Sequence, residues 1–153
     1  MVPKSKEDLK YWIIVASKDH VMIGLRDGIC QANHGNEAPL KKMGMGDGVI
    51  FYSSKETFEG NEKCQKFTAI GKIKDNEIYQ FKMADGRVPF RRRVEFYPSK
   101  DVDIRPLIES LSFIKNKKSW GYAFRFGMIQ ISYSDFEKIK DLMFLTQKNN
   151  FLC

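Results

Sequence analysis

The stretch that decides the fold is residues 11–16, Tyr-Trp-Ile-Ile-Val-Ala. A short run of β-branched and aromatic residues without polar interruption is typical of a buried β-strand. Five further stretches, each bounded by turn or polar residues, predict additional strands: 48–53, 67–73, 77–83, 90–97 and 122–131. The polar residues 54–66 are expected to form a mobile connection, and residues 84–87, Ala-Asp-Gly-Arg, are expected to form a turn.

Helices are expected between and after these strands. Ser17 or Asp19 is expected to cap a short helix that stops before Gly28, and further helical segments are expected near 38–43 and 105–114. About six strands with helices near both ends, and without a regular βαβ alternation, predict the α+β class. We expect a curved, mostly antiparallel sheet or barrel.

The C-terminal segment predicts an amphipathic helix. Ser134 and Glu137 have the spacing of a capping box, in which a hydroxyl and a carboxylate bond to backbone N–H groups at the start of a helix. Behind them, apolar residues recur at helical spacing, so that one face is expected to pack on the sheet: Phe136, Ile139, Met143 and Phe144.

Length and composition limit the classes of function. The chain has 153 residues, which suits one domain, and its three cysteines, Cys30, Cys64 and Cys153, lie far apart. Their odd number and spacing disfavour a disulfide framework, and with two histidines they predict neither a metal site nor a cofactor. No apolar run reaches the roughly 18 residues of a spanning helix, and the N-terminus lacks a secretory signal. A reducing, cytoplasmic location is therefore expected.

The positive charge is unevenly distributed. Of the formal charge of +7, nearly all lies between Lys82 and Arg125, which holds 11 Lys/Arg and five Asp/Glu, whereas the remainder holds 15 and 14. Aromatic residues interleave with these cations, a combination that suits phosphate contacts and base stacking. A solvated basic face explains the same pattern. On a strand, moreover, Arg91 and Arg93 would face one way and Arg92 the other, so the triplet would not form one flat patch.

Catalytic motifs are missing from the sequence. It contains no phosphate-binding glycine loop and no nucleophile elbow. Cys30 and His34 have the residue types of a nucleophile and its base, but Cys30 follows Ile29 in an apolar patch, where a buried, inert cysteine is the commoner case. His20 and His34 are better interpreted as hydrogen-bonding groups around a binding site.

Short motifs follow one another in order along essentially the whole chain. They include Gly28-Ile-Cys-Gln-Ala-Asn-His-Gly35, Gly46-Asp-Gly-Val-Ile-Phe-Tyr52, Pro89-Phe-Arg-Arg92, Trp120-Gly121 and Ser132-x-x-Asp135-Phe136. The ordered set resembles the EVE domain, a PUA-like domain related to YTH and ASCH domains. The resemblance implies a small PUA-like β-barrel flanked by helices that accepts a modified base of RNA or DNA. It implies an EVE domain at residues 11–146, between an N-terminal extension, 1–10, and a C-terminal tail, 147–153.

A weaker resemblance to YTH domains bears on the ligand. Gln31 occupies the place where that family has one tryptophan of the cage around a methylated adenine. An amide offers a donor and an acceptor instead of a flat apolar wall. The resemblance therefore implies a modified pyrimidine, or another base read at its edge, in place of a methylated adenine.

The resemblance also implies which residues contact the ligand. A flipped base needs stacking rings and hydrogen bonds to its edge, and its phosphates need cations. Stacking is assigned to Tyr52 and Trp120, with the barrel core as the alternative for each, whereas Trp12 is expected in the core. The expected edge-reading residues, for which local turn bonding is the alternative, are Ser17, His20, Gln31, Asn33, His34 and Ser53. The expected phosphate-binding residues are Lys41, Lys42, Arg92, Lys117, Lys118 and Arg125.

Arg125 is flanked by two rings, Phe124 and Phe126. If residues 122–131 form a strand, side chains alternate between its faces, and Arg125 lies on the opposite face from both rings. Its guanidinium would then be free for a phosphate.

The sequence therefore predicts a non-catalytic nucleic-acid-binding module. A basic surface would hold RNA or DNA, and an aromatic and polar pocket would read a modified base, with methylation as the expected modification. Two alternatives remain open: a small hydrolase of modified nucleosides with His20 as its general base, and a basic module that docks a protein. We expect a monomer without a membrane partner.

Overall fold

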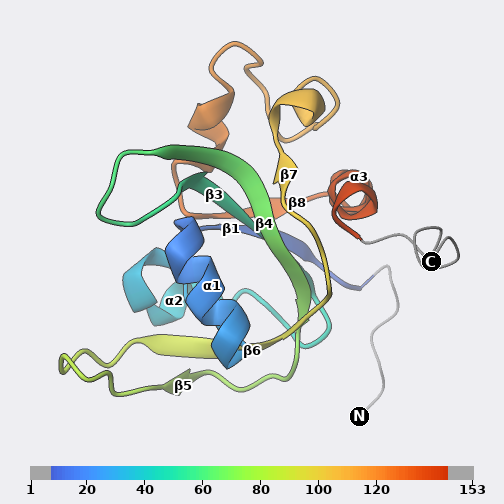
Figure 1. Cartoon of the computed structure of the whole chain (residues 1–153). Coiled ribbons are helices and arrows are strands. Elements are labelled where there is room, and N and C mark those ends of the chain that lie inside the picture. Colours follow the sequence, from blue (N-terminus) through green and yellow to red (C-terminus); the bar gives the residue numbers. More distant parts are fainter. Residues whose placement is uncertain (1–7, 145–153) are drawn as a thin grey trace, which may run out of the picture.

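The computed structural model describes residues 8–144 and consists of a curled, half-barrel mixed sheet with helices on both faces (Figure 1). Six strands follow the order β2-β6-β4-β3-β1-β8. Their bounds are β1 Tyr11–Val15, β2 Ile29–Cys30, β3 Gly48–Lys55, β4 Lys63–Ile73, β6 Phe90–Phe96 and β8 Met128–Ile131. Two short strands lie off this path: β5, Tyr79–Gln80, pairs with β6, and β7, Val102–Asp103, pairs with β4.

One pair of strands is parallel. β1 runs beside β3 from the pair Tyr11 and Gly48 to the pair Val15 and Tyr52, whereas the other paired strands are antiparallel. The expected α+β class and the mostly antiparallel sheet are thus confirmed. Because β1 and β3 are parallel, their carboxyl ends meet at the same edge of the sheet.

Three α-helices and three 3₁₀-helices connect the strands. The α-helices are α1 Lys18–Asp27, α2 Glu37–Leu40 and α3 Tyr133–Met143, and the 3₁₀-helices are η1 Asn33–Gly35, η2 Arg105–Leu107 and η3 Trp120–Phe124. As predicted, Ser17 precedes α1, and Gly28 ends it in the left-handed conformation that glycine adopts easily, with φ 68°. Within residues 8–144, the helices are too short or too polar to cross a membrane.

The predicted cap of α3 is wrong. The helix starts at Tyr133, so that Ser132, and not Ser134, precedes it, and the Ser132 hydroxyl accepts a hydrogen bond of 3.1 Å from the Asp135 N–H. The buried carboxylate of Asp135 in turn accepts bonds from Ser112 and from the Phe113 N–H. The apolar face was predicted correctly for three residues, which are all buried: Phe136, Ile139 and Met143.

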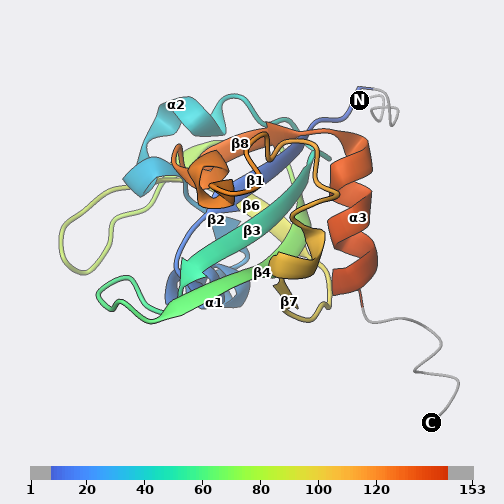
Figure 2. The ribbon, with the colours of Figure 1, turned by 90° about the horizontal axis from the view of Figure 1, so that it is seen from above.

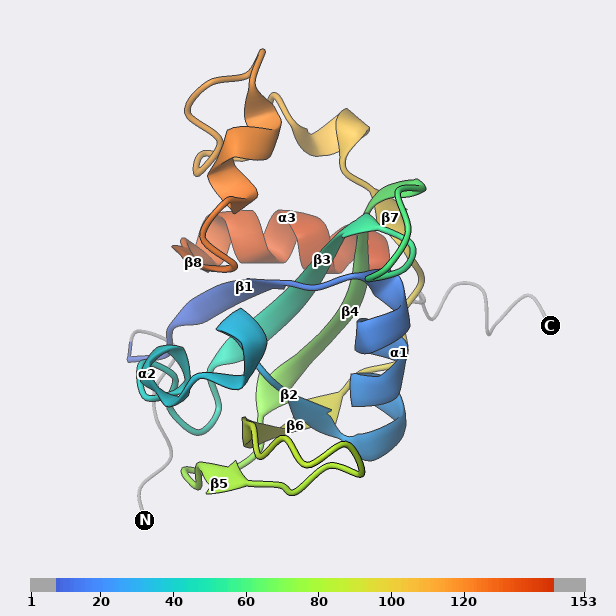
Figure 3. The same ribbon diagram turned by 90° about the vertical axis from the view of Figure 1, so that its left-hand side faces the viewer.

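The sheet is buried on both faces, which explains the uninterrupted apolar run of β1. Ile13 and Tyr52 pack on one face against η3 and α3, whereas Trp12, Ile14 and Phe51 face α1 and α2 on the other. In Figure 3, η2, η3 and α3 lie above the strands β1 and β3, and α1 and α2 lie below them. Trp12 is in the core as expected, and its indole N–H donates to Asp47.

Three segments differ from the expected elements. The connection expected at residues 54–66 is shorter, because β3 extends to Lys55 and β4 begins at Lys63, and the Glu56 N–H bonds to the Glu62 carbonyl across the remaining loop. The strand expected at 122–131 begins only at Met128, after η3 and a turn, and the helix expected at 105–114 is reduced to η2. The hairpin of β5 and β6 was predicted correctly.

Candidate functional site

The carboxyl ends of the parallel strands bring two buried hydroxyl groups to one edge. The Ala16 N–H bonds to the Tyr52 carbonyl at 3.1 Å, so the residues that follow, Ser17 and Ser53, lie in neighbouring chain segments. Ser17 is 7% exposed and Ser53 is fully buried, with its hydroxyl 2.8 Å from that of Thr68. The two serines that were predicted to read a base are therefore close together.

Asp19 holds the start of α1 against the β3–β4 hairpin. Its carboxylate accepts hydrogen bonds from the Ser17 hydroxyl at 2.5 Å and from the N–H groups of His20 and Phe58. Burial by itself would raise the pKa of Asp19, but these hydrogen bonds hold that pKa below its usual value. Figure 2 shows the tip of this hairpin beside α1.

His20 lies at the exposed margin of this edge. Its ring stacks on Phe58 with a centroid distance of 4.9 Å and an interplanar angle of 18°. The neighbouring Asp19 carboxylate bonds to the backbone and to Ser17, and among the described residues no hydrogen bond orients the imidazole. His20 therefore lacks the oriented partner that helps a histidine to act as a general base.

The loop that carries Asn33 and His34 is packed between two distant segments. Both residues have left-handed backbone angles, φ 46° and 62°, which are uncommon outside glycine. A Cβ placed on Gly127 would come within 2.2 Å of the Asn33 Oδ1, and one on Gly35 would come within 2.5 Å of the Pro89 Cβ. The two glycines thus allow close approach, and the strained backbone of this loop is typical of functional sites.

Gly127 ties this loop to the carboxyl end of β1. Its carbonyl accepts a hydrogen bond of 2.8 Å from the N–H of Val15, the last residue of β1. Asn33, which contacts Gly127, therefore lies near Ser17 although 16 positions separate them in the sequence. Gln31, half buried, directly follows Cys30 of β2, and the exposed His34 follows Asn33.

The prediction that Tyr52 stacks on a ligand is wrong. Its side chain is 1% exposed, and its ring stacks on Phe124 at a centroid distance of 4.0 Å and meets the Phe67 edge at 5.5 Å. Tyr52 lies on the face that η3 covers, so no ring face is left for a base. Trp120, at the start of η3, is partly buried against the same core.

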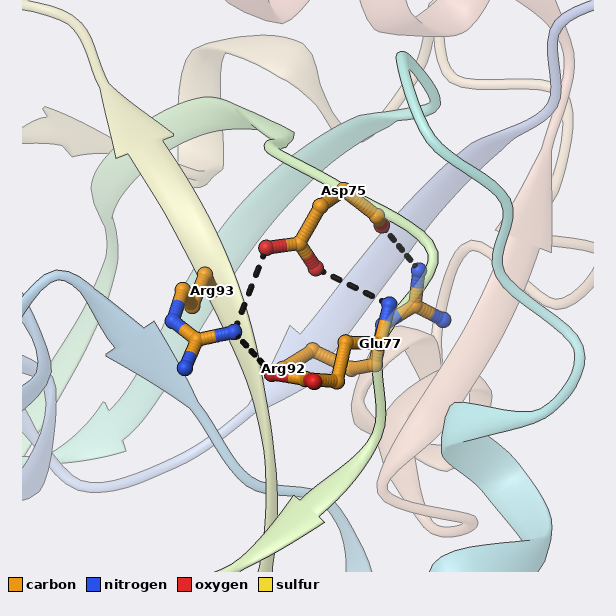
Figure 4. Close-up of polar contacts among 4 residues, drawn as sticks. All are labelled: Asp75, Glu77, Arg92 and Arg93. Atoms are coloured by element: carbon orange, nitrogen blue, oxygen red, sulfur yellow. Dashed lines mark hydrogen bonds and ion pairs between the residues drawn. The ribbon is translucent and has the colours of Figure 1, made fainter.

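The prediction that Arg92 binds a phosphate is also wrong. Its side chain is 1% exposed and donates to three carbonyls, those of Leu40, Met43 and Asp75, at 2.6–2.8 Å. Figure 4 shows Arg92 bonded to the backbone of Asp75, while Arg93 bonds to the carboxylates of Asp75 and Glu77. Arg92 thus joins β6 to the segments after α2 and β4.

The predicted alternation of the arginine triplet is confirmed. Arg92 bonds to backbone carbonyls inside the protein, whereas Arg91, itself buried, lies over the Phe81 ring at 4.2 Å and Arg93 lies over the Tyr79 ring at 4.5 Å. The triplet therefore forms no flat basic patch.

The predicted lysines are not gathered at this edge. Lys117 donates to the carbonyls of Ile108 and Leu111 at 3.0 and 2.9 Å, so its ammonium group stabilises the loop before η3. Lys41 and Lys42 are exposed, but they precede the start of β3, whereas Ser53 lies near its end. Lys118 is exposed in the loop before η3 and remains a candidate.

Arg125 is exposed, as expected, but its surroundings differ from the prediction. Its guanidinium carbon lies 3.4 Å from the centroid of the Tyr122 ring and 4.0 Å from that of Phe126. The segment is a 3₁₀-helix and a turn, so strand alternation does not apply, and residues three apart, such as Tyr122 and Arg125, are superimposed. Tyr122 and Phe126 were missed by the sequence analysis because it assumed a strand there.

Comparison with known families identifies the domain. The model of the EVE domain family matches residues 10–142. This chain belongs to the EVE domain family. The EVE domain is 46% identical over 123 residues to the UPF0310 protein in the gntR 5' region of Bacillus licheniformis, covering 80% of this chain and 84% of the relative. It is 45% identical over 132 residues to a UPF0310 protein of Mycolicibacterium vanbaalenii, covering 86% and 91%.

Solved structures share the fold of this EVE domain at low sequence identity. The YTH domain of the Zygosaccharomyces rouxii MRB1 protein, solved in complex with N6-methyladenosine RNA, has a TM-score of 0.53 at 15% identity, over 95% of this chain and 94% of that chain. A hypothetical protein from Leishmania major has a TM-score of 0.56 at 10% identity, over 90% and 96%. The expected EVE and PUA-like architecture is confirmed.

The cysteines of the EVE domain are unsuited to nucleophilic chemistry. Burial raises the pKa of the Cys30 thiol to about 12 and that of Cys64 to about 11, so neither ionises near neutral pH. Cys153 lies outside the described residues, as do most of the predicted N-terminal extension and the whole predicted C-terminal tail. Residues 8–144 contain no cluster of metal-ligating side chains.

The predicted site residues at this edge carry hydrogen-bonding side chains. Hydroxyl, amide and imidazole groups from Ser17, Asn33 and His34 supply both donors and acceptors, whereas the hydroxyl of Ser53 is fully buried. Arg125, two positions before Gly127, adds a cation that lies between two exposed rings.

Proposed function

We propose that this EVE domain binds RNA or DNA and holds a modified base, without catalysis, at the carboxyl ends of β1 and β3. The observation that carries the proposal is the convergence of three distant segments there: the ends of the two strands, the Asn33–His34 loop, and the turn that carries Arg125 and Gly127. Family membership and the shared fold of a YTH domain solved with N6-methyladenosine RNA support it.

The base would be recognised at its edge. A flipped base offers ring nitrogens, carbonyls and amino groups, which match the mixed donors and acceptors of Asn33, Gln31 and His34. The Ser17 hydroxyl, which donates to Asp19, can still accept a bond through its oxygen, whereas Ser53 is fully buried and bonded to Thr68 and offers no surface to a base. These side chains favour a base whose modification changes its hydrogen-bonding edge or lies next to that edge.

The phosphates would be contacted by exposed cations near the carboxyl ends of β1 and β3. Arg125 and Lys118 are the two predicted cations that are exposed and lie next to η3. The net charge of +7 adds a general attraction for the strand, which salt weakens. Affinity for an unmodified strand should therefore fall with salt, whereas the ratio of modified to unmodified affinity should persist.

A binding screen tests the proposal. Matched short strands of RNA and DNA, unmodified or carrying methylated cytosine or adenine, are titrated by fluorescence polarisation against wild type, Gln31→Ala, His34→Ala and the control Gln130→Ala. Gln130 is exposed on β8 and provides a matched amide outside the site. We expect at least about tenfold preference for one modified base, lost in the first two variants and kept in the control. Equal affinity for all strands at every salt concentration would refute base recognition.

A further inference from the structure

The two most exposed large apolar side chains of the described residues lie in η3 and in the turn between η3 and β8. Tyr122 is 62% exposed and Phe126 is 65% exposed. The guanidinium of Arg125 lies over both rings, at 3.4 and 4.0 Å from their centroids, and its Nη1 donates to the Tyr122 carbonyl at 2.7 Å. We call these three residues the Tyr122–Arg125–Phe126 column.

The column leaves aromatic surface and a cation in solvent. Within residues 8–144, Arg125 has no carboxylate partner, whereas the exposed Arg105 is paired with Asp103. The guanidinium covers one side of each ring, so the exposed surface of Tyr122 and Phe126 belongs to the opposite faces and the edges. Such faces are free to stack on another planar group.

The column is held firmly on both sides. On one side, Phe124 stacks on Tyr52 and meets the Phe113 ring edge-on at 5.7 Å, which fixes η3 to the core. On the other side, Gly127 bonds to Val15 and contacts Asn33. Because the column is ordered before any ligand arrives, binding to it costs little conformational entropy.

The chemistry of the column fits a nucleic acid strand better than a protein surface. An apolar protein surface would bury the Arg125 guanidinium without an acceptor, which is unfavourable. A nucleotide supplies both groups that the column lacks: a flat base for the ring faces and phosphate oxygens for the free guanidinium donors. The charge of the protein, +7, has the sign that attracts such a strand.

We infer that the Tyr122–Arg125–Phe126 column stacks an unpaired base of the nucleotide that neighbours the recognised base, so that the ligand is a single strand or a loop. The inference rests on the proposed function, because the column borders the site through Gly127 and Asn33. A base within a continuous duplex is stacked on both sides and cannot offer a face to either ring.

The test compares single strands, duplexes and strands with an abasic nucleotide at each position flanking the modified base. Proteins are wild type, the double variant Tyr122→Ala/Phe126→Ala, and the control Tyr133→Ala. Tyr133, on α3, is 44% exposed and serves as a matched aromatic residue outside the column. We expect the double variant to bind single strands about tenfold more weakly, the control to bind as wild type does, and an abasic flanking nucleotide to weaken wild type but not the double variant.

The outcomes separate this inference from the proposed function. A modified-to-unmodified ratio near one in wild type contradicts base recognition, whereas unchanged single-strand affinity in the double variant contradicts the column alone. The inference is also overturned if the double variant loses as much affinity for duplexes as for single strands. It is overturned as well if wild type binds a duplex as tightly as a single strand. Capture of a protein through the column with no effect on strand binding would assign it to protein docking and overturn it too.

A second variant guards against indirect effects of the double substitution. Phe126→Trp keeps a large ring beside Arg125 and adds a fluorophore to the column. We expect it to bind single strands like wild type. Relative to wild type, in which Trp12 and Trp120 also emit, we expect additional quenching of the indole emission on titration with an ordinary strand and no additional quenching with the strand that is abasic at the contacting position. Quenching that does not depend on the flanking base would contradict stacking.

Discussion

Arg92 and Arg125 come from the same basic stretch of the chain and have opposite surroundings. Arg92 is buried in the half-barrel and holds three backbone carbonyls, whereas Arg125 is exposed between two rings. The local charge surplus does not distinguish them. The comparison teaches that a cluster of cations in sequence is not a surface patch, because strand alternation and helix position decide where each guanidinium lies.

The same contrast extends to the aromatic residues around them. Tyr52 and Phe124 stack on each other inside the core, whereas Tyr122 and Phe126 lie in solvent within a few residues of Phe124. The buried region therefore contributes stability, and the exposed region is where we propose that the strand is bound. Three substitutions test this division between the two regions.

The largest effect is expected for Arg92→Met. The substitution keeps an apolar stem but removes the guanidinium bonds to the carbonyls of Leu40, Met43 and Asp75. Loss of these bonds should lower the free energy of unfolding by about 3 kcal/mol or more. Urea denaturation followed by circular dichroism measures it. The control Arg93→Met removes partly exposed ion pairs and the contact with the Tyr79 ring and should cost about 1 kcal/mol or less, so equal losses would contradict a structural role for Arg92.

An intermediate effect is expected for Gly127→Ala, compared with Gly86→Ala. Both glycines have positive φ, 79° and 92°, so each alanine should cost about 1 kcal/mol of stability from backbone strain. Only at Gly127 does the new methyl group meet a side chain, and the Asn33 amide can yield by rotating away. We expect Gly127→Ala alone to reduce the preference for the modified base. A preference kept in both variants would show that Asn33 does not read the base.

The smallest effect on stability is expected for Arg125→Gln. Arg125 is exposed and loses only its contacts with the Tyr122 and Phe126 rings and the Tyr122 carbonyl, so the free energy of unfolding should change by less than about 1 kcal/mol. Its charge should matter for binding: the slope of log affinity against log salt should fall by about one, as for one lost phosphate contact. The control Arg105→Gln removes a cation that is paired with Asp103 and should leave the slope unchanged. The same slope in both variants would contradict a specific phosphate contact.

Part of the candidate site could be predicted from local sequence. Ser17 was expected at a helix start and Gly28 at its end, because capping depends on a few adjacent residues. The set Ser17, Asn33 and Ser53 was assigned to one site through the family resemblance, and the structure brings these residues near one edge. The role of Ser17 and Asn33 in reading a base stays a prediction.

Other parts of the site could not be predicted, and the reasons are specific. Tyr52 was expected to stack on a ligand because sequence does not reveal that η3 covers its face of the sheet. Tyr122 and Phe126 were missed because an apolar, aromatic stretch of ten residues fits a strand as well as a 3₁₀-helix followed by a short strand.

The sequence by itself determined the α+β class, the main strands, the ends of α1, the buried face of α3 and the family. These depend on local propensity, on the periodicity of apolar residues and on motif order, all of which are present along a single stretch of chain. Only the tertiary structure decided which cations and rings are exposed to solvent, because burial depends on elements far apart in sequence. The segments after α2 and β4 enclose Arg92. Within the described residues, no element covers the Tyr122–Arg125–Phe126 column. The inward or outward position of a side chain is therefore a property of the packed sheet and helices, and not of the residue type.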